Sequence, residues 1–308
     1  MKKTFGFIAL LCLITSISMA QANEHKPIKI LQDTTNAKKD TAKVVKDTLW
    51  KKQNSVIFTT EQSYFNNWSA GGFSTFAFSG YYKSFFNYKK GKINWNNNID
   101  LGYGQMLQDI TGNGFKDTAN HFQKSEDKIE LNSVFGYKAF AAWNYSFLLN
   151  LKSQFDNGYK DNSLISSTFS PTVLTSSVGL EYKKPSYSVL FSFLTGKTTY
   201  VGDDRLLQSG ILGFTQPDKH WYFSLGSFVK FFFQKDIFTN INLMAKVEFF
   251  YDYSKPLKDI DVNTEIFLNM KINKYLTAFI SVQAIIDYDF NTSLQFKERF
   301  GLSIPINF

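Results

Sequence analysis

Cysteine is almost absent from this 308-residue sequence. The single cysteine, Cys12, lies in an apolar stretch near the N-terminus, so the chain downstream of it has no thiol. Disulfides, zinc–thiolate sites and cysteine nucleophiles are therefore excluded there, which suits passage through an oxidising compartment. Histidine is also scarce, with only three in the chain, and no phosphate-binding or dinucleotide-binding fingerprint is present. We predict no metal site and no cofactor.

Long apolar runs are missing as well. Residues 1–20 combine a basic start, an apolar run and a small-x-small site, which predicts a secretory signal peptide cleaved after Ala20. That run is too short for a membrane-spanning helix, and no later segment has eighteen uninterrupted apolar residues. Aromatic residues nevertheless make up 18% of the chain. Abundant aromatics without long apolar runs favour a β-barrel, in which only every second residue meets lipid.

Residues 21–52 differ in composition from everything after them. They carry eight basic and four acidic residues, whereas the remaining 24 basic and 22 acidic residues beyond the signal peptide nearly balance. The basic excess is therefore mostly in this segment and is weak evidence for nucleic acid, which we do not expect as a partner. Two interpretations stay open. The segment is either a flexible periplasmic tail, or a plug or partner-binding segment that docks through Val44, Val45, Leu49 and Trp50.

The remaining residues, 53–308, alternate between apolar and polar in long runs, which is the periodicity of half-buried strands. Short connections alternate with connections that include the three longest, as in outer-membrane barrels with periplasmic turns. We predict an all-β, antiparallel, up-and-down transmembrane β-barrel of about 12 strands. The predicted strands are 55–64, 73–88, 92–107, 125–139, 143–159, 171–183, 187–200, 221–234, 238–253, 261–273, 276–290 and 294–308.

The last run has a regular apolar face. Five large apolar side chains alternate with smaller or polar ones up to the final residue: Phe300, Leu302, Ile304, Ile306 and Phe308. This pattern resembles the C-terminal insertion signal of bacterial outer-membrane barrels. The resemblance implies a location in the bacterial outer membrane, contact with outer-membrane lipid, and the barrel-assembly machinery as a partner during insertion.

Charged residues on the opposite face of the strands should line the lumen. The predicted lumen-facing set is Asp100, Lys128, Glu130, Lys152, Asp156, Lys230, Lys246, Glu248, Asp252, Glu265, Lys271, Asp287, Lys297 and Arg299. Either these charges line a polar pore, or they pair and fill a lumen of intermediate width. Apolar residues that also point inward pack against a plug or loop, or line a path for a hydrophobic ligand: Phe228, Phe232, Phe250, Phe267 and Phe279.

Few residues support the hypothesis of an enzyme. His25 falls in the tail and His121 in a long connection, so no predicted strand carries a histidine. Asp203 and Asp204 share a connection with His220, which is similar to the loop acid–histidine arrangement of outer-membrane proteases. A histidine in a polar loop is usually only solvated. We therefore expect a protein that is not an enzyme and keep hydrolysis as a third hypothesis.

Two short elements add a family resemblance. The first contains Phe65, Asn67, Trp68, Gly71 and Gly72, and the second contains Trp95, Asn97, Asp100, Tyr103 and Gly104. Together with the terminal Phe they resemble the Bacteroidota outer-membrane barrels grouped as domain of unknown function 3078. The resemblance implies fold and location but no chemistry. We predict a narrow channel or transport barrel for small polar solutes; the alternative is a non-enzymatic structural or partner-binding barrel.

Overall fold

The computed structural model describes residues 49–64, 74–109, 115, 122–160, 163–209, 218–288 and 291–308. The predicted signal peptide, nearly all of the predicted tail and the first family element (Phe65, Asn67, Trp68, Gly71 and Gly72) lie outside these residues. Within them, no helix has both the length and the apolar character needed to span a membrane.

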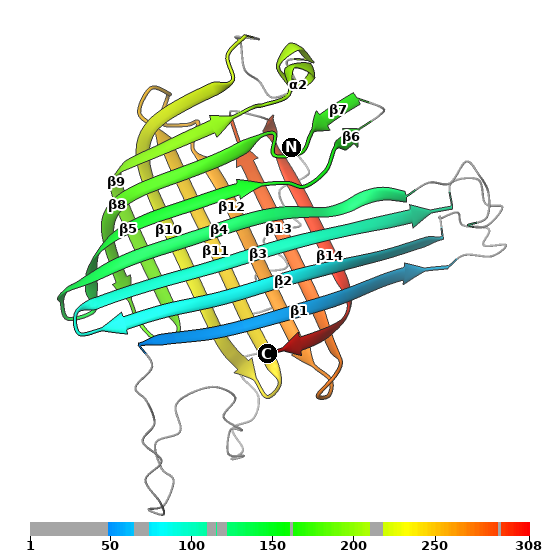
Figure 1. Cartoon of the computed structure of the whole chain (residues 1–308), viewed down its shortest axis with the longest axis horizontal. Helices are drawn as coiled ribbons and strands as arrows, with labels where there is room; N and C mark the ends of the chain where they lie inside the picture. The colour runs from blue at the N-terminus through cyan, green and yellow to red at the C-terminus, as the bar shows by residue number, and fades with distance from the viewer. Residues whose placement is uncertain are drawn as a thin grey trace, which may run out of the picture. The chain divides into compact units, whose positions relative to one another are not determined.

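Twelve antiparallel strands form a closed barrel, which confirms the predicted fold class (Figure 1). Each strand pairs with the next one along the chain, and the last pairs with the first. The barrel strands are β1 (Trp50–Ser63), β2 (Thr75–Lys90), β3 (Ile93–Gln108), β4 (Phe122–Phe140), β5 (Trp143–Ser153), β8 (Thr172–Lys183), β9 (Tyr187–Tyr200), β10 (Trp221–Phe238), β11 (Ile241–Asp252), β12 (Asp261–Lys271), β13 (Thr277–Asp287) and β14 (Asn291–Asn307).

Three short elements lie outside the barrel wall, in two connections at the same end of the barrel. They are β6 (Gly158–Lys160), β7 (Ser163–Ser166) and α2 (Asp204–Ser209), and β6 pairs with β7 as a small separate hairpin. The predicted strand 143–159 is therefore too long. The chain leaves the wall after Ser153 because the Gln154 side chain donates hydrogen bonds to the carbonyls of Ser167 and Ser170.

Several other predicted boundaries were wrong: β4 and β14 each begin three residues before the predicted start, at Phe122 and Asn291. The first strand begins at Trp50, three residues inside the predicted tail, and Trp50 pairs with Tyr88 of β2. The turn between β10 and β11 lies at 239–240 instead of 235–237. Asn240 adopts a φ of 65°, a left-handed conformation that asparagine tolerates better than most residues. Alternation alone does not reveal where such a turn falls.

The two ends of the barrel differ. At the short-turn end the connections are 91–92, 141–142, 184–186, 239–240 and 272–276. The opposite, long-loop end carries the connections 64–74, 109–121, 154–171, 201–220, 253–260 and 288–290. Because the strand count is even, Trp50 and Phe308 both lie at the short-turn end, where Asn54 and Phe308 exchange backbone hydrogen bonds.

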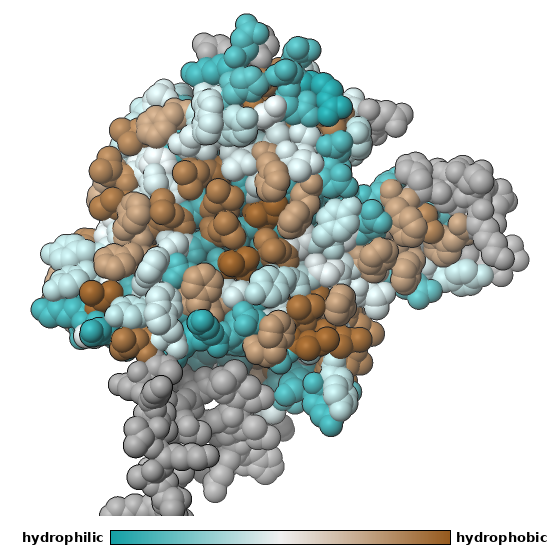
Figure 2. All heavy atoms as spheres, in the orientation of Figure 1, coloured by the Kyte–Doolittle hydropathy of each residue, from teal (hydrophilic) through white to brown (hydrophobic). Residues whose placement is uncertain are grey.

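The wall separates two kinds of side chain. Along β5, Tyr145, Phe147 and Leu149 are exposed, whereas the alternating residues Ser146, Leu148 and Asn150 are buried. On β14 the five residues of the predicted apolar face all point outward and are 42–70% exposed. Figure 2 shows hydrophobic residues across the middle of the visible face and hydrophilic residues gathered toward the upper end. This is the arrangement that a barrel needs when its outside meets an apolar solvent.

Candidate functional site

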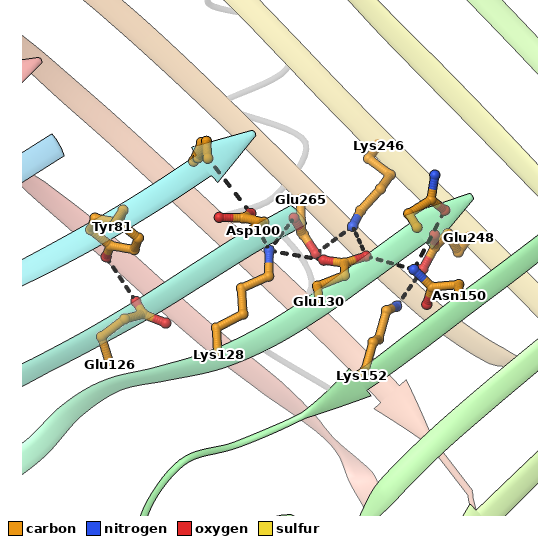
Figure 3. A network of polar contacts seen from close by, with 12 residues as sticks. Tyr81, Asp100, Glu126, Lys128, Glu130, Asn150, Lys152, Lys246, Glu248 and Glu265 are labelled. Atoms are coloured by element: carbon orange, nitrogen blue, oxygen red, sulfur yellow. Dashed lines mark hydrogen bonds and ion pairs between the residues drawn. The ribbon is translucent and has the colours of Figure 1, made fainter. Parts of the chain in front are cut away.

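Charged side chains from opposite walls of the barrel meet in its interior. Lys246 on β11 places Nζ 3.3 Å from Glu130 on β4 and 2.8 Å from Glu265 on β12. Lys128 on β4 contacts the second oxygen of Glu130 at 2.9 Å and Asp100 on β3 at 2.9 Å. We call these five residues, Asp100, Lys128, Glu130, Lys246 and Glu265, the cross-barrel cluster (Figure 3).

A fourth acid, Glu248, extends the cluster along β11. Glu248 lies 2.7 Å from Nζ of Lys152 on β5 and 3.2 Å from Nζ of Lys230 on β10. The side chain of Asn150 donates to Glu130 at 3.0 Å (Figure 3). Each carboxylate is thereby matched with an ammonium group, as buried charges require. The period of two explains the placement, because Lys128 and Glu130 are two residues apart on the same strand and face the same side of it.

Arg299 on β14 organises a separate group of contacts. Its Nε donates to Glu61 on β1 at 2.9 Å, and its Nη1 donates to Glu126 on β4 at 2.8 Å. Glu126 also accepts hydrogen bonds from Tyr81 at 3.1 Å and from Lys297 at 3.0 Å. One arginine therefore links the last strand of the barrel to the first and the fourth.

Two cavities lie on either side of the cross-barrel cluster. The first, of about 190 Å³, lies toward the long-loop end and is lined by residues that include Lys152, Lys197, Glu248, Phe228 and Phe250. The second, of about 180 Å³, lies toward the short-turn end and is lined by residues that include Asp100, Lys128, Glu265, Phe267 and Phe279. The paired charges thus form one layer between two small hollows.

Most of the predicted lumen-facing charges take part in these interior contacts. Besides the residues above, Asp287 lies 3.5 Å from Lys197, and Asp252 accepts hydrogen bonds from Ser254 at the end of β11. Lys271 is exposed at the short-turn end of β12. Of the inward apolar residues, Phe228, Phe250 and Phe279 are buried, and Phe267 stacks on Phe279 with 5.8 Å between the ring centroids.

The prediction that Asp156 faces the lumen is wrong. It lies outside the lumen, in the connection after β5, because the chain has already left the wall at Ser153. Its carboxylate accepts a hydrogen bond from the Tyr103 hydroxyl at 3.0 Å, and its carbonyl accepts one from Lys124 at 2.8 Å.

The second family element splits between the two faces of β3. Trp95 and Tyr103 point outward, and Trp95 Nε1 donates to Ser133 at 2.8 Å. Asp100 points inward into the cross-barrel cluster. Gly104 is required by close packing, since a β-carbon there would lie 2.2 Å from the Ser79 hydroxyl.

Several interior residues were missed by the sequence analysis. Glu126 shares the face of Lys128 and could have been found from the same alternation. Glu61 lies in the first predicted strand and Tyr81 in the second, and neither was among the predicted lumen-facing residues. Lys83 lies 4.0 Å from Asp100 and stands over the Phe267 ring at 5.6 Å. Unlike Glu126, the residues Glu61, Tyr81 and Lys83 have no signal that sets them apart from surface positions until the register of the strands is known.

The acid–histidine connection does not assemble as a relay. Arg205 donates from Nε to Asp203 at 3.0 Å and from Nη2 at 2.7 Å. These bonds hold the pKa of Asp203 at about 2. His220 donates from Nδ1 to the Val201 carbonyl at 2.7 Å, and its Nε2 lies 3.6 Å from Asp204. Asp203 and His220 are thus engaged with different partners.

Comparison with known sequences points to the family named above over part of the chain. The family model described as "Protein of unknown function (DUF3078)" matches residues 60–159, which contain both family elements. Curated protein sequences gave no match.

Three solved structures that resemble the chain are each remote from it in sequence. The COG4313 outer membrane channel from Pseudomonas putida F1 is 9% identical, with 83% of this chain and 95% of that chain covered and a TM-score of 0.40. The translocator domain of the autotransporter NalP from Neisseria meningitidis is 8% identical, with 83% and 88% covered and a TM-score of 0.35. Outer membrane phospholipase A from Escherichia coli is 14% identical, with 82% and 95% covered and a TM-score of 0.34.

Proposed function

We propose that this protein is a bacterial outer-membrane barrel that provides a narrow path for small polar solutes, with the cross-barrel cluster as its constriction. The outward faces of the strands are apolar, whereas the interior holds paired charges and hydrogen-bonded amides. Closure of the sheet satisfies the backbone hydrogen bonds that hydrocarbon cannot satisfy. The predicted signal peptide and the Phe308 strand support passage through the barrel-assembly machinery into outer-membrane lipid, and the family resemblance supports a Bacteroidota origin.

One observation carries the transport proposal. A single layer of paired side chains separates a cavity that faces the long-loop end from a cavity that faces the short-turn end. Lysine and glutamate have several rotatable bonds, and their alternative rotamers could find water or a second partner in the adjoining hollow. Small displacements of Lys246 and Glu130 would then join the two cavities.

Single-channel recording in planar bilayers tests this proposal. In the double variant Glu130→Ala/Lys246→Ala the net charge is unchanged and the two side chains that meet across the lumen are shortened. We expect a larger unit conductance than for the wild type. The matched control is Asp203→Ala/Arg205→Ala, which removes an opposite pair outside the barrel wall and should leave the conductance unchanged. No current above leak in any of the three proteins would reject the path.

The alternative is a non-enzymatic structural or partner-binding barrel. The same ion pairs favour it, because a lumen that is bridged by paired side chains can also be a permanently filled one. A partner that is captured by the full-length mature chain and lost when residues 21–48 are deleted would support it. Absence of enzymatic activity stays a prediction: His220→Ala should leave any lipid or peptide hydrolysis by the purified protein unchanged.

A further inference from the structure

The seam that closes the barrel is paired over only part of its length. Six residues of β1, Ser55–Thr60, pair with Asn307–Leu302 of β14. The eleven residues Asn291–Gly301 of β14 have no partner in the described part of β1. By contrast, β1 pairs with β2 along all its 14 residues, and β14 pairs with β13 up to Asn291. Figure 1 shows the cause: β1 runs to one side with β2–β4, whereas β14 rises with β13.

The unpaired edge begins within the part of β14 that would lie in a membrane. About 9–11 residues of a tilted strand cross the hydrocarbon, so a crossing that starts at Phe308 extends past Gly301. The outward side chains of the unpaired stretch stay largely apolar and exposed, as Phe300, Phe296 and Leu294 show. An open edge in hydrocarbon leaves costly unpaired backbone groups. Among the described residues, the seam therefore has fewer register pairs than any other strand pair of the wall.

Side chains bridge β1 and β14 where the backbone pairing stops. Glu61 and Gly301 occupy the next position after the last register pair, Thr60 and Leu302. A β-carbon at Gly301 would lie 2.8 Å from Cγ of Glu61, so the two strands are still close at this level. The guanidinium of Arg299 bonds Glu61 and lies 5.9 Å from the Tyr81 ring centroid and 5.8 Å from that of Phe279.

The second cavity lies directly behind the contact between Arg299 and Glu61. Its lining includes Thr59 of β1, Arg299 of β14 and the stacked rings of Phe267 and Phe279. Two buried oxygen atoms that line it, Oγ1 of Thr59 and Oδ1 of Asp100, have no hydrogen-bond partner among the described residues. Buried polar atoms normally have partners, so these two oxygen atoms are open to a donor from outside the described residues.

We propose that the β1–β14 seam is a lateral portal through which single-chain amphiphiles with a hydrogen-bond-donating head group pass between the membrane and this cavity. A hydroxyl or amine head meets Thr59 and Asp100, and the first carbons of the chain lie on the Phe267–Phe279 pair. A cavity of about 180 Å³ holds a head group and the start of one chain. The rest of the chain lies in the seam. This route is lateral and independent of any axial path.

Photolabelling tests the portal in lipid nanodiscs. The probe is a long-chain fatty alcohol with a diazirine next to its hydroxyl end, and the labelled residues are mapped by mass spectrometry. The variant Glu61→Cys/Gly301→Cys, made with Cys12→Ser, carries a disulfide that closes the seam. The 2.8 Å contact implies a β-carbon separation of at most about 4.3 Å, within the range for a disulfide.

We expect label on the rings of Phe267 and Phe279 in the wild type and in the reduced variant, and none above background in the oxidised variant. The reduced and oxidised forms of one protein are matched controls for the loss of Glu61. Lumenal label that persists after oxidation would show entry from a barrel end and overturn the portal. So would label confined to outward residues such as Phe300, or failure of the disulfide to form.

A near-isosteric variant tests the head-group chemistry separately. Thr59→Val removes one unpartnered acceptor while it keeps the side-chain shape. Labelling by the alcohol should fall, whereas labelling by the corresponding diazirine alkane should not change. An equal effect on the two probes would overturn the assignment of a donor head group. Neither readout needs a current, so failure of the portal and failure of the axial path are distinguishable.

Discussion

Lys246 and Glu130 meet across the barrel, with Nζ 3.3 Å from Oε1, although β11 and β4 lie in opposite walls. Both side chains are almost completely buried. Their contact bridges the lumen between the two cavities. Each also keeps another partner, Lys128 for Glu130 and Glu265 for Lys246, so loss of one member leaves the other buried charge with fewer partners.

Removing one member of this pair should lower the free energy of unfolding more than removing both. We expect Lys246→Met to lower the free energy of unfolding by about 3–5 kcal/mol, because Glu130 then keeps its charge with fewer partners. Addition of Glu130→Gln should restore part of that loss. Equilibrium urea unfolding in lipid vesicles measures the two single variants and the double variant.

The pair of Asp203 with the exposed Arg205, outside the barrel wall, is the control for that cycle. Asp203→Asn and Arg205→Met should each change the unfolding free energy little, because solvent screens this pair. Strictly additive effects of Glu130→Gln and Lys246→Met would show that the two side chains do not depend on each other.

Close backbone packing gives a second prediction. A β-carbon at Gly226 would lie 2.0 Å from the Tyr251 carbonyl oxygen, next to an irregularity in the register of β10 and β9. Gly226→Ala should therefore destabilise the barrel by roughly 1–3 kcal/mol, the usual cost of overpacking. Gly80→Ala is the matched control, since its β-carbon would meet nothing closer than 3.8 Å. Equal unfolding midpoints for the two variants would contradict the strand packing described above.

The acidic connection after β9 gives a prediction about pH. The Arg205 side chain is the main cause of the low pKa of Asp203, which is about 2 against an ordinary value of 3.8. Because the pKa is lowered on folding, the contact stabilises the segment above pH 3.8 and is lost as the pH falls through about 2. Arg205→Ala should raise the pKa of Asp203 toward 3.8 in a carboxyl-carbon NMR titration. An unchanged midpoint would mean that Arg205 is not the cause.

Much of the barrel wall is predictable from the sequence because its strands obey one rule. Each residue of β5 or β14 faces either the outside or the interior, and apolar and polar side chains alternate accordingly. Turn positions are less predictable, since Lys235 and Asp236 continue the β10 strand where the sequence suggested a turn. The left-handed Asn240 is one asparagine among many in this chain.

The interior contacts are not predictable in the same way. Alternation places Lys128 and Glu130 inside but does not say that they meet Lys246 and Glu265, because that depends on the stagger of strands far apart in the chain. The sequence also does not reveal where β1 diverges from β14, since both strands keep their alternation where the pairing stops. The prediction for Asp156 was wrong because the alternation was extended past the point where the chain leaves the wall.

The barrel wall separates an apolar outside from a polar interior. Spin labels at two adjacent positions of β13 test this separation most directly. Ile280 faces outward beside Phe300 and Ser281 lines the second cavity. In vesicles, a label at Ile280→Cys should collide with dissolved oxygen and be shielded from an aqueous nickel chelate, and a label at Ser281→Cys should show much less oxygen accessibility. Equal exposure of both labels to the aqueous chelate would contradict it.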